Sequence, residues 1–378
     1  MYSLTGYGSM MADRVRMDAY RAALRRAIHP GSIVLDLGAG PAIMSCIAAQ
    51  LGAAKIYAIE PDASLELGRA IARANGFENR IEIYREFSNS VNLPERADVI
   101  VADMRGVLPA FGGHFRAIAD ARDRFLKPGG TLIPQCDTLW VALAEEPKKY
   151  DDLVGGWNAE GLDLSIGRRM IANTWSKTHL AVGQLLSPPL QWAEVDYRKV
   201  VETALAGRVQ TEVARTGLVH GLCVWFDADL LDGIGFSNAP GQPEAIYGQA
   251  FFPLLGPIPV ECGDRVDIAL RADLTGDDYT WSWHTTIYSA AGQTKADYTQ
   301  STFLGVPLSA QILRKRADSF VPTLTEDARI DANIIELMSS GLNLRDIASQ
   351  ISTQYPARFP NWKAVLNRVA ALSSRYSE

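Results

Sequence analysis

Residues 33–43 constrain the fold of this chain most strongly, because an apolar run leads there into a Gly-x-Gly turn and then into an amphipathic segment. The run Ile33–Leu37 is typical of a buried strand, and the residues after Ala42 have helical spacing. A strand, turn and helix in this order place backbone N–H groups and a helix N-terminus at the carboxyl end of the strand. The sequence therefore predicts a pocket for a nucleotide-like ligand at this turn.

Apolar runs alternate with helix-periodic segments through the first third of the chain. The runs are 33–37, 55–59, 81–84, 98–102 and 131–133, and the helical segments are 42–51, 63–75 and 113–126. This alternation is typical of parallel strands joined by helices. We therefore predict an α/β fold class, with a Rossmann-like domain over residues 1–134 that ends after the turn Lys127-Pro128-Gly129-Gly130.

Beyond residue 134 the pattern changes to short runs of alternating polarity, which are typical of antiparallel strands. Examples are 218–226, 264–272 and 279–289. We predict an antiparallel β-barrel over residues 135–307, with an inserted helical arm at about 146–179, where charge, paired glycines and helical spacing interrupt the strands. Helical segments near 326–339, 343–353 and 361–374 predict a small helical module over residues 308–378.

Composition excludes several classes of partner. The formal charge is −6, and no cluster of Lys and Arg interleaves with aromatic residues, which argues against a nucleic-acid partner. The most apolar region, 42–59, is interrupted by polar residues, so we expect no membrane-spanning segment, and with no signal pattern at the N-terminus we expect a cytoplasmic protein. The cysteines lack ligand or disulfide spacing, so we expect reduced core residues and no metal site; they are Cys46, Cys136, Cys223 and Cys262.

The residues around the turn distinguish between cofactors. A dinucleotide favours a third glycine where this chain has Ile43, and the Asp36 carboxylate would repel a pyrophosphate. The same carboxylate suits the ammonium of a methionine moiety, and Glu60, 20 residues after Gly40, can accept both ribose hydroxyls. We therefore expect S-adenosyl-L-methionine as the cofactor. The alternative for Asp36 is a turn residue that accepts hydrogen bonds from local backbone N–H groups. The alternative for Glu60 is a neighbour of a helix N-cap, since Pro61 and Asp62 follow it.

Several of these segments resemble the protein arginine methyltransferases, a family within the class I S-adenosylmethionine-dependent methyltransferases. Met10–Arg21 is similar to that family's N-terminal helix, Val34–Ser45 to its cofactor motif, and Ala58–Glu60 to its ribose-binding strand end. Lys127–Pro134 matches the passage into its β-barrel. Trp157–Ser165 resembles part of its dimerisation arm, which implies a homodimer.

The resemblance implies roles for residues near the turn. Arg16 would bind the cofactor carboxylate, Asp36 and Gly38 the methionine end, with Gly40 in the same loop, Glu60 the ribose, and Asn89 would stand where the family has an adenine-contacting Glu. The residues themselves support the first of these roles, because a guanidinium at this spacing on a helix can hold a carboxylate in a bidentate pair.

The acceptor site departs from the family pattern. The family holds a substrate guanidinium between two glutamates of one loop, where this chain has Asp103 at the first position and Gly112 at the second. Arg105 adds a positive charge nearby, which would work against a cationic substrate if it points inward. The family's Thr-His-Trp loop is replaced by residues 245–247, Ala-Ile-Tyr, so the His that pairs with the helix carboxylate, here Asp13, is missing.

We expect Asp103 and Tyr247 to be the catalytic residues. The sulfonium is already an activated methyl donor, so the protein must align the nucleophile and remove one proton. Asp103 would orient the acceptor or take its proton, and Tyr247 would line the acceptor pocket. The expected function is methyl transfer to a nitrogen of a peptide, protein or small metabolite; an O-methyltransferase or natural-product methyltransferase, and a non-catalytic cofactor-binding protein, are the alternatives.

Residues 308–378 lie outside this resemblance. Their order of helices faintly resembles the small winged-helix (PqqD-like) modules of pyrroloquinoline-quinone synthesis, which bind peptide leaders. If so, the substrate would be a peptide or a carrier-bound intermediate. The alternative is a helical cap that packs on the barrel.

Overall fold

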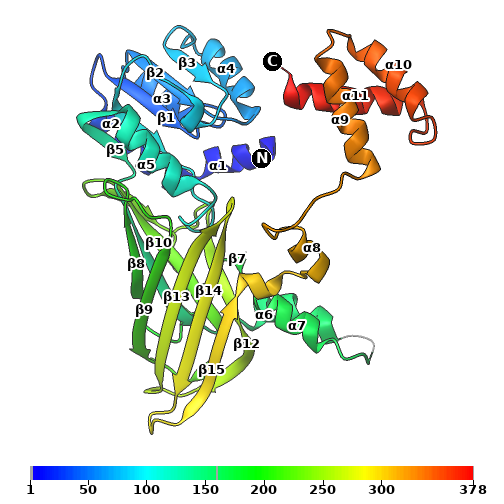
Figure 1. Cartoon of the computed structure of the whole chain (residues 1–378). Helices are drawn as coiled ribbons and strands as arrows, with labels where there is room; N and C mark the ends of the chain where they lie inside the picture. Colours follow the sequence, from blue (N-terminus) through cyan, green and yellow to red (C-terminus); the bar gives the residue numbers. More distant parts are fainter. Residues whose placement is uncertain (1–2, 159–160, 378) are drawn as a thin grey trace. The chain divides into compact units, whose positions relative to one another are not determined.

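The computed structural model describes residues 3–158 and 161–377. It divides into two compact units, Met1–Pro307 and Leu308–Glu378 (Figure 1). The first unit contains a parallel sheet and two antiparallel sheets, and the second is helical.

The parallel sheet has five strands in the order β3-β2-β1-β4-β5. The strands are β1 (Ile33–Leu37), β2 (Lys55–Ile59), β3 (Ile81–Tyr84), β4 (Ala97–Ala102) and β5 (Leu126–Ile133), and the connecting helices are α3 (Ile43–Gln50), α4 (Ser64–Ala74) and α5 (His114–Phe125). Four of the five residues in β1 and in β2 are buried, which explains their continuous apolar runs. The strand order reverses between β1 and β4, and ligands of such sheets bind at the carboxyl ends of the strands beside this point. The predicted α/β class is confirmed.

Two helices precede this sheet, α1 (Leu4–Ala12) and α2 (Arg14–Ala27). Asp13 separates them and caps α2, because its carboxylate accepts a hydrogen bond from the backbone N–H of Arg16. The N-terminal part of α2 thereby has a fixed position, and it carries the buried Arg16 side chain.

The antiparallel region consists of a six-stranded and a four-stranded sheet, which together form a barrel-like body (Figure 1). The first has the order β7-β12-β10-β6-β8, with β11 pairing β10, and the second has the order β15-β14-β13-β9. The strands are β6 (Cys136–Ala144), β7 (Ser176–Thr178), β8 (Leu190–Asp196), β9 (Leu205–Glu212), β10 (Gly217–Leu231), β11 (Ile234–Ser237), β12 (Gln249–Val260), β13 (Arg265–Thr275), β14 (Asp278–Tyr288) and β15 (Thr294–Ser301).

Aromatic side chains fill the space between the two antiparallel sheets. Phe252 of β12 lies 5.4 Å from Trp281 and 5.1 Å from Trp283, measured between ring centroids. Both tryptophans are 1% exposed and come from alternate positions of β14. The period-two spacing of these residues in the sequence therefore corresponds to one inward face.

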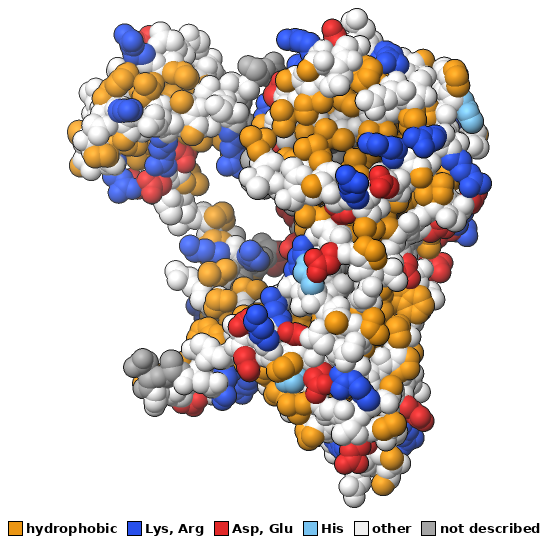
Figure 2. Space-filling model, turned by 180° about the vertical axis from the view of Figure 1, so that it is seen from behind, with side chains coloured by type: hydrophobic (Ala, Val, Ile, Leu, Met, Phe, Trp, Pro, Cys, Tyr) orange, Lys and Arg blue, Asp and Glu red, His pale blue; other side chains and the backbone are white. Residues whose placement is uncertain are grey.

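The inserted arm is shorter than we predicted. It comprises α6 (Pro147–Val154), the 3₁₀ turn η2 (Gly155–Asn158) and α7 (Ser165–Ile171), and residues 176–178 return to the sheet as β7, paired with β12. Tyr150 and Val154 of α6 pack on the outer face of the six-stranded sheet, against residues such as Cys223 and Trp225. Over the barrel, acidic and basic side chains are interspersed on the face in Figure 2, in line with surface pairs such as Arg271 with Asp273.

The second unit contains α8 (Ala310–Arg314), α9 (Glu326–Met338), α10 (Leu344–Gln354) and α11 (Trp362–Tyr376). The last three correspond to the predicted segments, whereas α8 was not predicted. Their fully buried core consists of Ile330, Ile334, Ile347, Ala348, Ile351, Val365 and Val369. Residues 308–377 contain no strand, so the β-hairpin of a winged helix is not part of this unit as described.

The prediction that all four cysteines are core residues needs correction. Cys262 is exposed and Cys136 is half-buried, so only Cys46 and Cys223 are core residues; all four are free thiols. Cys262 lies in the tight turn that leads into β13, where its neighbours are polar. Within the described residues, no helix is long and apolar enough to cross a membrane, and no group of three or more His, Cys, Asp and Glu is arranged to hold a metal ion.

Candidate functional site

The glycine turn after β1 has a backbone that favours residues without a Cβ. Gly38 has φ of 70° and Gly40 has φ of 50°, both in the left-handed region. A Cβ at Gly38 would lie 2.5 Å from Cγ of Met104, which follows β4, and a Cβ at Gly40 would lie 3.0 Å from the ring of Tyr7 in α1. The turn is therefore enclosed by segments from the N-terminus and from the loop after β4.

Two carboxylates lie beside this turn. Asp36 accepts hydrogen bonds from the backbone N–H (2.8 Å) and the hydroxyl (2.6 Å) of Ser45, near the start of α3. Burial raises the pKa of Asp36 to about 6. Glu60 accepts from the N–H of Gly40 at 3.1 Å and from that of Asp62 at 2.9 Å. Both side chains thus accept local N–H groups, and both also lie where the sequence placed the cofactor.

The predicted adenine position is separate from these groups. Asn89 lies in η1 (Ser88–Ser90), which follows β3, and its side chain is exposed. Its carbonyl accepts a long hydrogen bond, 3.5 Å, from the hydroxyl of Ser90. The structure therefore brings together Asp36, Gly38, Gly40 and Glu60, but not Asn89.

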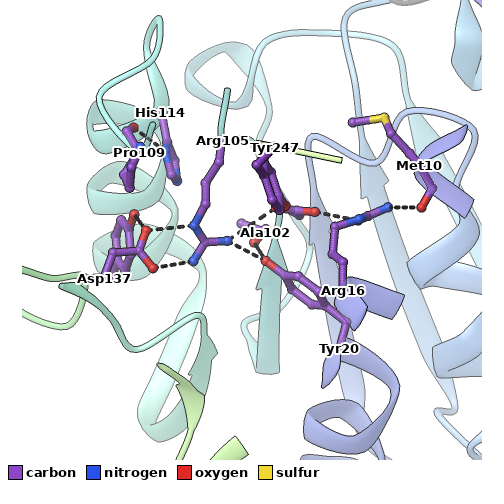
Figure 3. Close-up of polar contacts among 11 residues, drawn as sticks. Met10, Arg16, Tyr20, Ala102, Arg105, Pro109, His114, Asp137 and Tyr247 are labelled. Atoms are coloured by element: carbon purple, nitrogen blue, oxygen red, sulfur yellow. Dashed lines mark hydrogen bonds and ion pairs between the residues drawn. The ribbon is translucent and has the colours of Figure 1, made fainter. Parts of the chain in front are cut away.

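Arg16 lies between α1 and the loop after β4 (Figure 3). One terminal nitrogen pairs with Asp103 at 2.5 Å and the other donates to the carbonyl of Met10 at 3.0 Å. The third nitrogen, Nε, is buried and has no partner among the described residues. Burial acts to lower the pKa of Arg16, but Asp103, Tyr247 and Tyr20 together raise that pKa above its ordinary value. A buried guanidinium with one free donor suits a carboxylate ligand.

The carboxylate of Asp103 contacts three other side chains. Its Oδ2 pairs with Arg16, and its Oδ1 accepts from the hydroxyl of Tyr247 at 2.7 Å and lies 3.3 Å from Nη1 of Arg105. Burial acts to raise the pKa of Asp103, but the two arginines hold it below its ordinary value. The sequence assigned Asp103 and Tyr247 to the acceptor site and Arg16 to the cofactor, and the structure brings all three into one cluster.

Sequence reasoning missed the partners of Arg105. Both oxygens of Asp137 in β6 accept from this guanidinium at 2.7 Å, and the hydroxyl of Tyr20 in α2 accepts from it at 2.7 Å. Tyr197 donates to Asp137 at 2.6 Å, and the guanidinium lies over the ring of Phe226 at 5.6 Å. Arg105 points inward but is matched by Asp137. The local signal was an acidic residue near the start of a mostly apolar strand.

The loop that carries Tyr247 is attached to the start of α2. Asp13 accepts from the N–H of Ile246 at 2.7 Å, while its other oxygen caps α2. The ammonium of Lys177 donates to the carbonyl of Ile246. A backbone N–H thus takes the place of the missing histidine. His114 nearby is buried, hydrogen-bonded to the carbonyl of Pro109 at 3.0 Å, and burial lowers its pKa to about 4.

Comparisons with known proteins agree with this architecture. The family model described as the arginine methyltransferase oligomerization subdomain matches residues 135–286, and the one described as ribosomal protein L11 methyltransferase matches residues 21–134. Protein arginine N-methyltransferase PRMT10 of Oryza sativa subsp. japonica is 30% identical over 302 residues, covering 69% of this chain and 78% of the relative. The chain belongs to the protein arginine N-methyltransferase family. It is an S-adenosylmethionine-dependent methyltransferase.

Other family members extend the comparison. Protein arginine N-methyltransferase 6 of Xenopus tropicalis is 28% identical over 285 residues, covering 71% of this chain and 81% of the relative. The crystal structure of Arabidopsis thaliana protein arginine methyltransferase 10 aligns with a TM-score of 0.71 and 25% identity, over 79% of this chain and 97% of that one. The PRMT6–SAH structure aligns with a TM-score of 0.60 at 21% identity, over 75% of this chain and all of that one, which supports the fold.

Proposed function

We propose that this chain transfers a methyl group from S-adenosyl-L-methionine to a nitrogen of a protein or peptide. Arg16 carries the proposal: its guanidinium is buried, fixed by Asp103 and Met10, and retains one nitrogen without a partner among the described residues. That nitrogen suits the carboxylate of the methionine moiety. The names of the relatives support the methyl-transfer reaction and a protein acceptor.

The residues around the turn fit the remainder of the cofactor. Asp36, ionised above its pKa of about 6, would hold the ammonium, and the Gly38 and Gly40 backbone would allow close approach. Glu60 would exchange its local N–H groups for the ribose hydroxyls, and Asn89 would contact the adenine from its exposed position. When bound, the cofactor supplies a methyl group activated by a sulfonium.

The side chains of Asp103 and Tyr247 would line the acceptor pocket and orient the acceptor. The two arginines that lower the pKa of Asp103 keep it ionised but also make it a weak proton acceptor. We therefore assign Asp103 to orientation rather than to general-base catalysis. Tyr247 stacks on Phe236 with ring centroids 5.6 Å apart, which fixes the hydroxyl that reaches Asp103.

The first experiment measures binding of S-adenosylhomocysteine by calorimetry and then methyl transfer from labelled cofactor to extract proteins. Arg16→Met should weaken binding at least tenfold, because it removes the carboxylate partner. Arg14→Met is the matched control on the same helix, since Arg14 is exposed, and it should leave the affinity unchanged. No binding by the wild-type chain, or equal effects of the two substitutions, would contradict the proposal.

We further propose that the chain forms a homodimer through its arm. α6 packs on its own barrel, yet Trp157, Leu162 and Ile166 are 42%, 68% and 65% exposed. Large exposed apolar residues on a projecting segment are typical of an interface, and the matched oligomerization subdomain supports this reading. The native mass in solution should be twice the mass of one chain. The substitution Ile166→Asp should reduce the native mass to that of one chain.

A further inference from the structure

Tyr247 lies near the end of a loop, residues 238–248, that joins β11 to β12. Its side chain is buried, and its hydroxyl donates to Asp103 at 2.7 Å. The stack on Phe236 fixes the plane of the ring, but the backbone of a loop lacks the hydrogen bonds of a strand and needs contacts of its own. The position of the hydroxyl therefore depends on the groups that hold the backbone beside Tyr247.

Two side chains from different elements hold Ile246, the residue before Tyr247. The N–H of Ile246 donates to Asp13, between α1 and α2, at 2.7 Å. Its carbonyl accepts from the ammonium of Lys177 in β7, and this carbonyl belongs to the peptide group that joins Ile246 to Tyr247. The two contacts therefore fix the direction in which the chain enters Tyr247.

The rest of the Lys177 side chain packs against the same loop. Gly248 has φ of 59°, and a Cβ there would lie 2.8 Å from Cε of Lys177 and 2.7 Å from the carbonyl oxygen of Thr178. The stem of Lys177 thus occupies the space beside Gly248. β7 pairs with β12, with Lys177 opposite Ala250, so the backbone at the base of this side chain is also fixed.

The surroundings of Lys177 favour its charged form. Burial lowers the pKa of Lys177, while the carboxylates of Asp13 and Glu244 oppose this shift. Ile246 stands where the family pattern has the histidine partner of Asp13, and Lys177 supplies a positive charge near this carboxylate instead. Because the donor is charged, its hydrogen bond to the Ile246 carbonyl is stronger than one between neutral groups.

We propose that Lys177 is a positioning residue of the acceptor site, because it fixes the loop that keeps the Tyr247 hydroxyl on Asp103. This inference rests on the proposed function, in which Asp103 and Tyr247 orient the acceptor nitrogen. Methyl transfer requires that nitrogen in line with the methyl carbon and the sulfur, so a small displacement of these side chains lowers the rate. Lys177 is not among the residues around the cofactor turn, so its loss lowers turnover and leaves cofactor affinity unchanged.

Three variants test this role, with labelled S-adenosyl-L-methionine as the donor and extract proteins as the acceptor. Lys177→Met removes the donor but keeps an apolar stem; kcat should fall at least tenfold and the apparent KM should change less than threefold. Lys177→Arg keeps a charged donor and should retain at least a third of the wild-type kcat. Lys199→Met is the matched control and should keep the wild-type kcat, since the Lys199 side chain is 82% exposed.

Calorimetry with S-adenosylhomocysteine separates slow sites from unfolded ones. The stoichiometry of binding counts the folded sites, so that kcat is expressed per site, and the affinity of each variant should stay within twofold of wild type. Lys177→Met as active per site as Lys199→Met, or Lys177→Arg as slow as Lys177→Met, would overturn the inference.

A double-mutant cycle with Tyr247→Phe shows whether Lys177 acts through the Tyr247 hydroxyl. Tyr247→Phe alone should lower kcat at least tenfold, and Lys177→Met added to it should lower kcat by less than a further twofold. Effects that multiply would show that Lys177 acts independently of this hydroxyl, which contradicts the inference.

A wild-type chain that labels no extract protein would refute the proposed function, and a crystal structure then still tests the inference. In the S-adenosylhomocysteine complex of Lys177→Met, the Tyr247 hydroxyl should lie beyond hydrogen-bond distance of Asp103. An unchanged contact between these two side chains would overturn the role of Lys177.

Discussion

At the scale of single residues, the glycine turn gives the most direct prediction. Gly38→Ala would place a Cβ 2.5 Å from Cγ of Met104 at φ of 70°, so the backbone of the turn is strained and the Met104 side chain must move. We expect the affinity for S-adenosylhomocysteine to fall at least tenfold by calorimetry. Gly52→Ala is the control, because Gly52 has φ of 99° with nothing within 4 Å of its Cβ. It should reduce stability by about 1 kcal/mol without changing affinity; equal affinities for both variants would contradict the assignment.

The raised pKa of Asp36 predicts that the free energy of unfolding depends on pH. Burial raises its pKa to about 6 in the folded chain, so between its ordinary value and pH 6 the folded state binds this proton more tightly than the unfolded state does. The contribution of Asp36 to stability therefore falls as pH rises through this window. Asp36→Asn keeps an acceptor for Ser45 and should raise the free energy of unfolding at pH 7.5 by up to about 3 kcal/mol. Urea unfolding at pH 7.5 and pH 4 checks this, since the difference should vanish at pH 4; the variant should also bind S-adenosylhomocysteine more weakly.

The sequence predicts which residues gather at the ends of adjacent strands, but it does not predict ion pairs between residues from different parts of the fold. Asp36, Gly38, Gly40 and Glu60 end adjacent parallel strands or begin their connections, so strand order alone places them together. Arg105 lies in the loop after β4 and Asp137 lies 32 residues further on in β6, and their pairing depends on how the barrel packs on this loop. Nothing in local spacing encodes that contact. The grouping of these four residues beside the turn was therefore predictable, whereas the pairing of Arg105 with Asp137 was not.

At the scale of elements, the ion pair between Arg105 and Asp137 links the loop after β4 to β6. Asp137→Ala would remove the carboxylate that accepts two hydrogen bonds from a fully buried guanidinium, which costs about 3–5 kcal/mol. We expect a lower midpoint in urea unfolding followed by far-UV circular dichroism. Asp273→Ala removes the exposed partner of Arg271 in β13 and should leave the midpoint unchanged, because exposed pairs contribute little. A similar midpoint for both variants would contradict a structural role for the buried pair.

Periodicity predicted several of the elements and missed others. Period-two spacing located β13 and β14, because their inward positions are apolar and most of their outward positions polar, whereas β10 is buried on both faces over most of its length. The end of the arm was misassigned, since residues 176–178 form a strand of only three residues, too short for a pattern. Helix α8, with five residues and no buried side chain, gave no apolar stripe for the same reason.

At the scale of the whole molecule, the second unit has its own core and is joined by an exposed segment, since residues 309–327 are all exposed. We propose that this unit binds part of the acceptor. A tether then raises the effective concentration of that acceptor at the first unit without new contacts in the site. Truncation after Pro307 should leave the affinity for S-adenosylhomocysteine within about twofold and lower kcat/KM for the acceptor at least tenfold, mainly through KM.

A second experiment adds residues 308–378 as a separate polypeptide. It shows whether this unit binds the acceptor or caps the barrel. If the unit binds the acceptor, the isolated unit in excess sequesters it and inhibits the full-length chain, and it does not restore the truncated chain, because the tether is missing. If the unit only caps the barrel, truncation instead exposes apolar surface, so the shortened chain aggregates and the added unit restores it. Light scattering and initial rates on the same samples report both outcomes. If the added unit restores the truncated chain and does not inhibit the full-length chain, the unit does not bind the acceptor and instead stabilises the barrel.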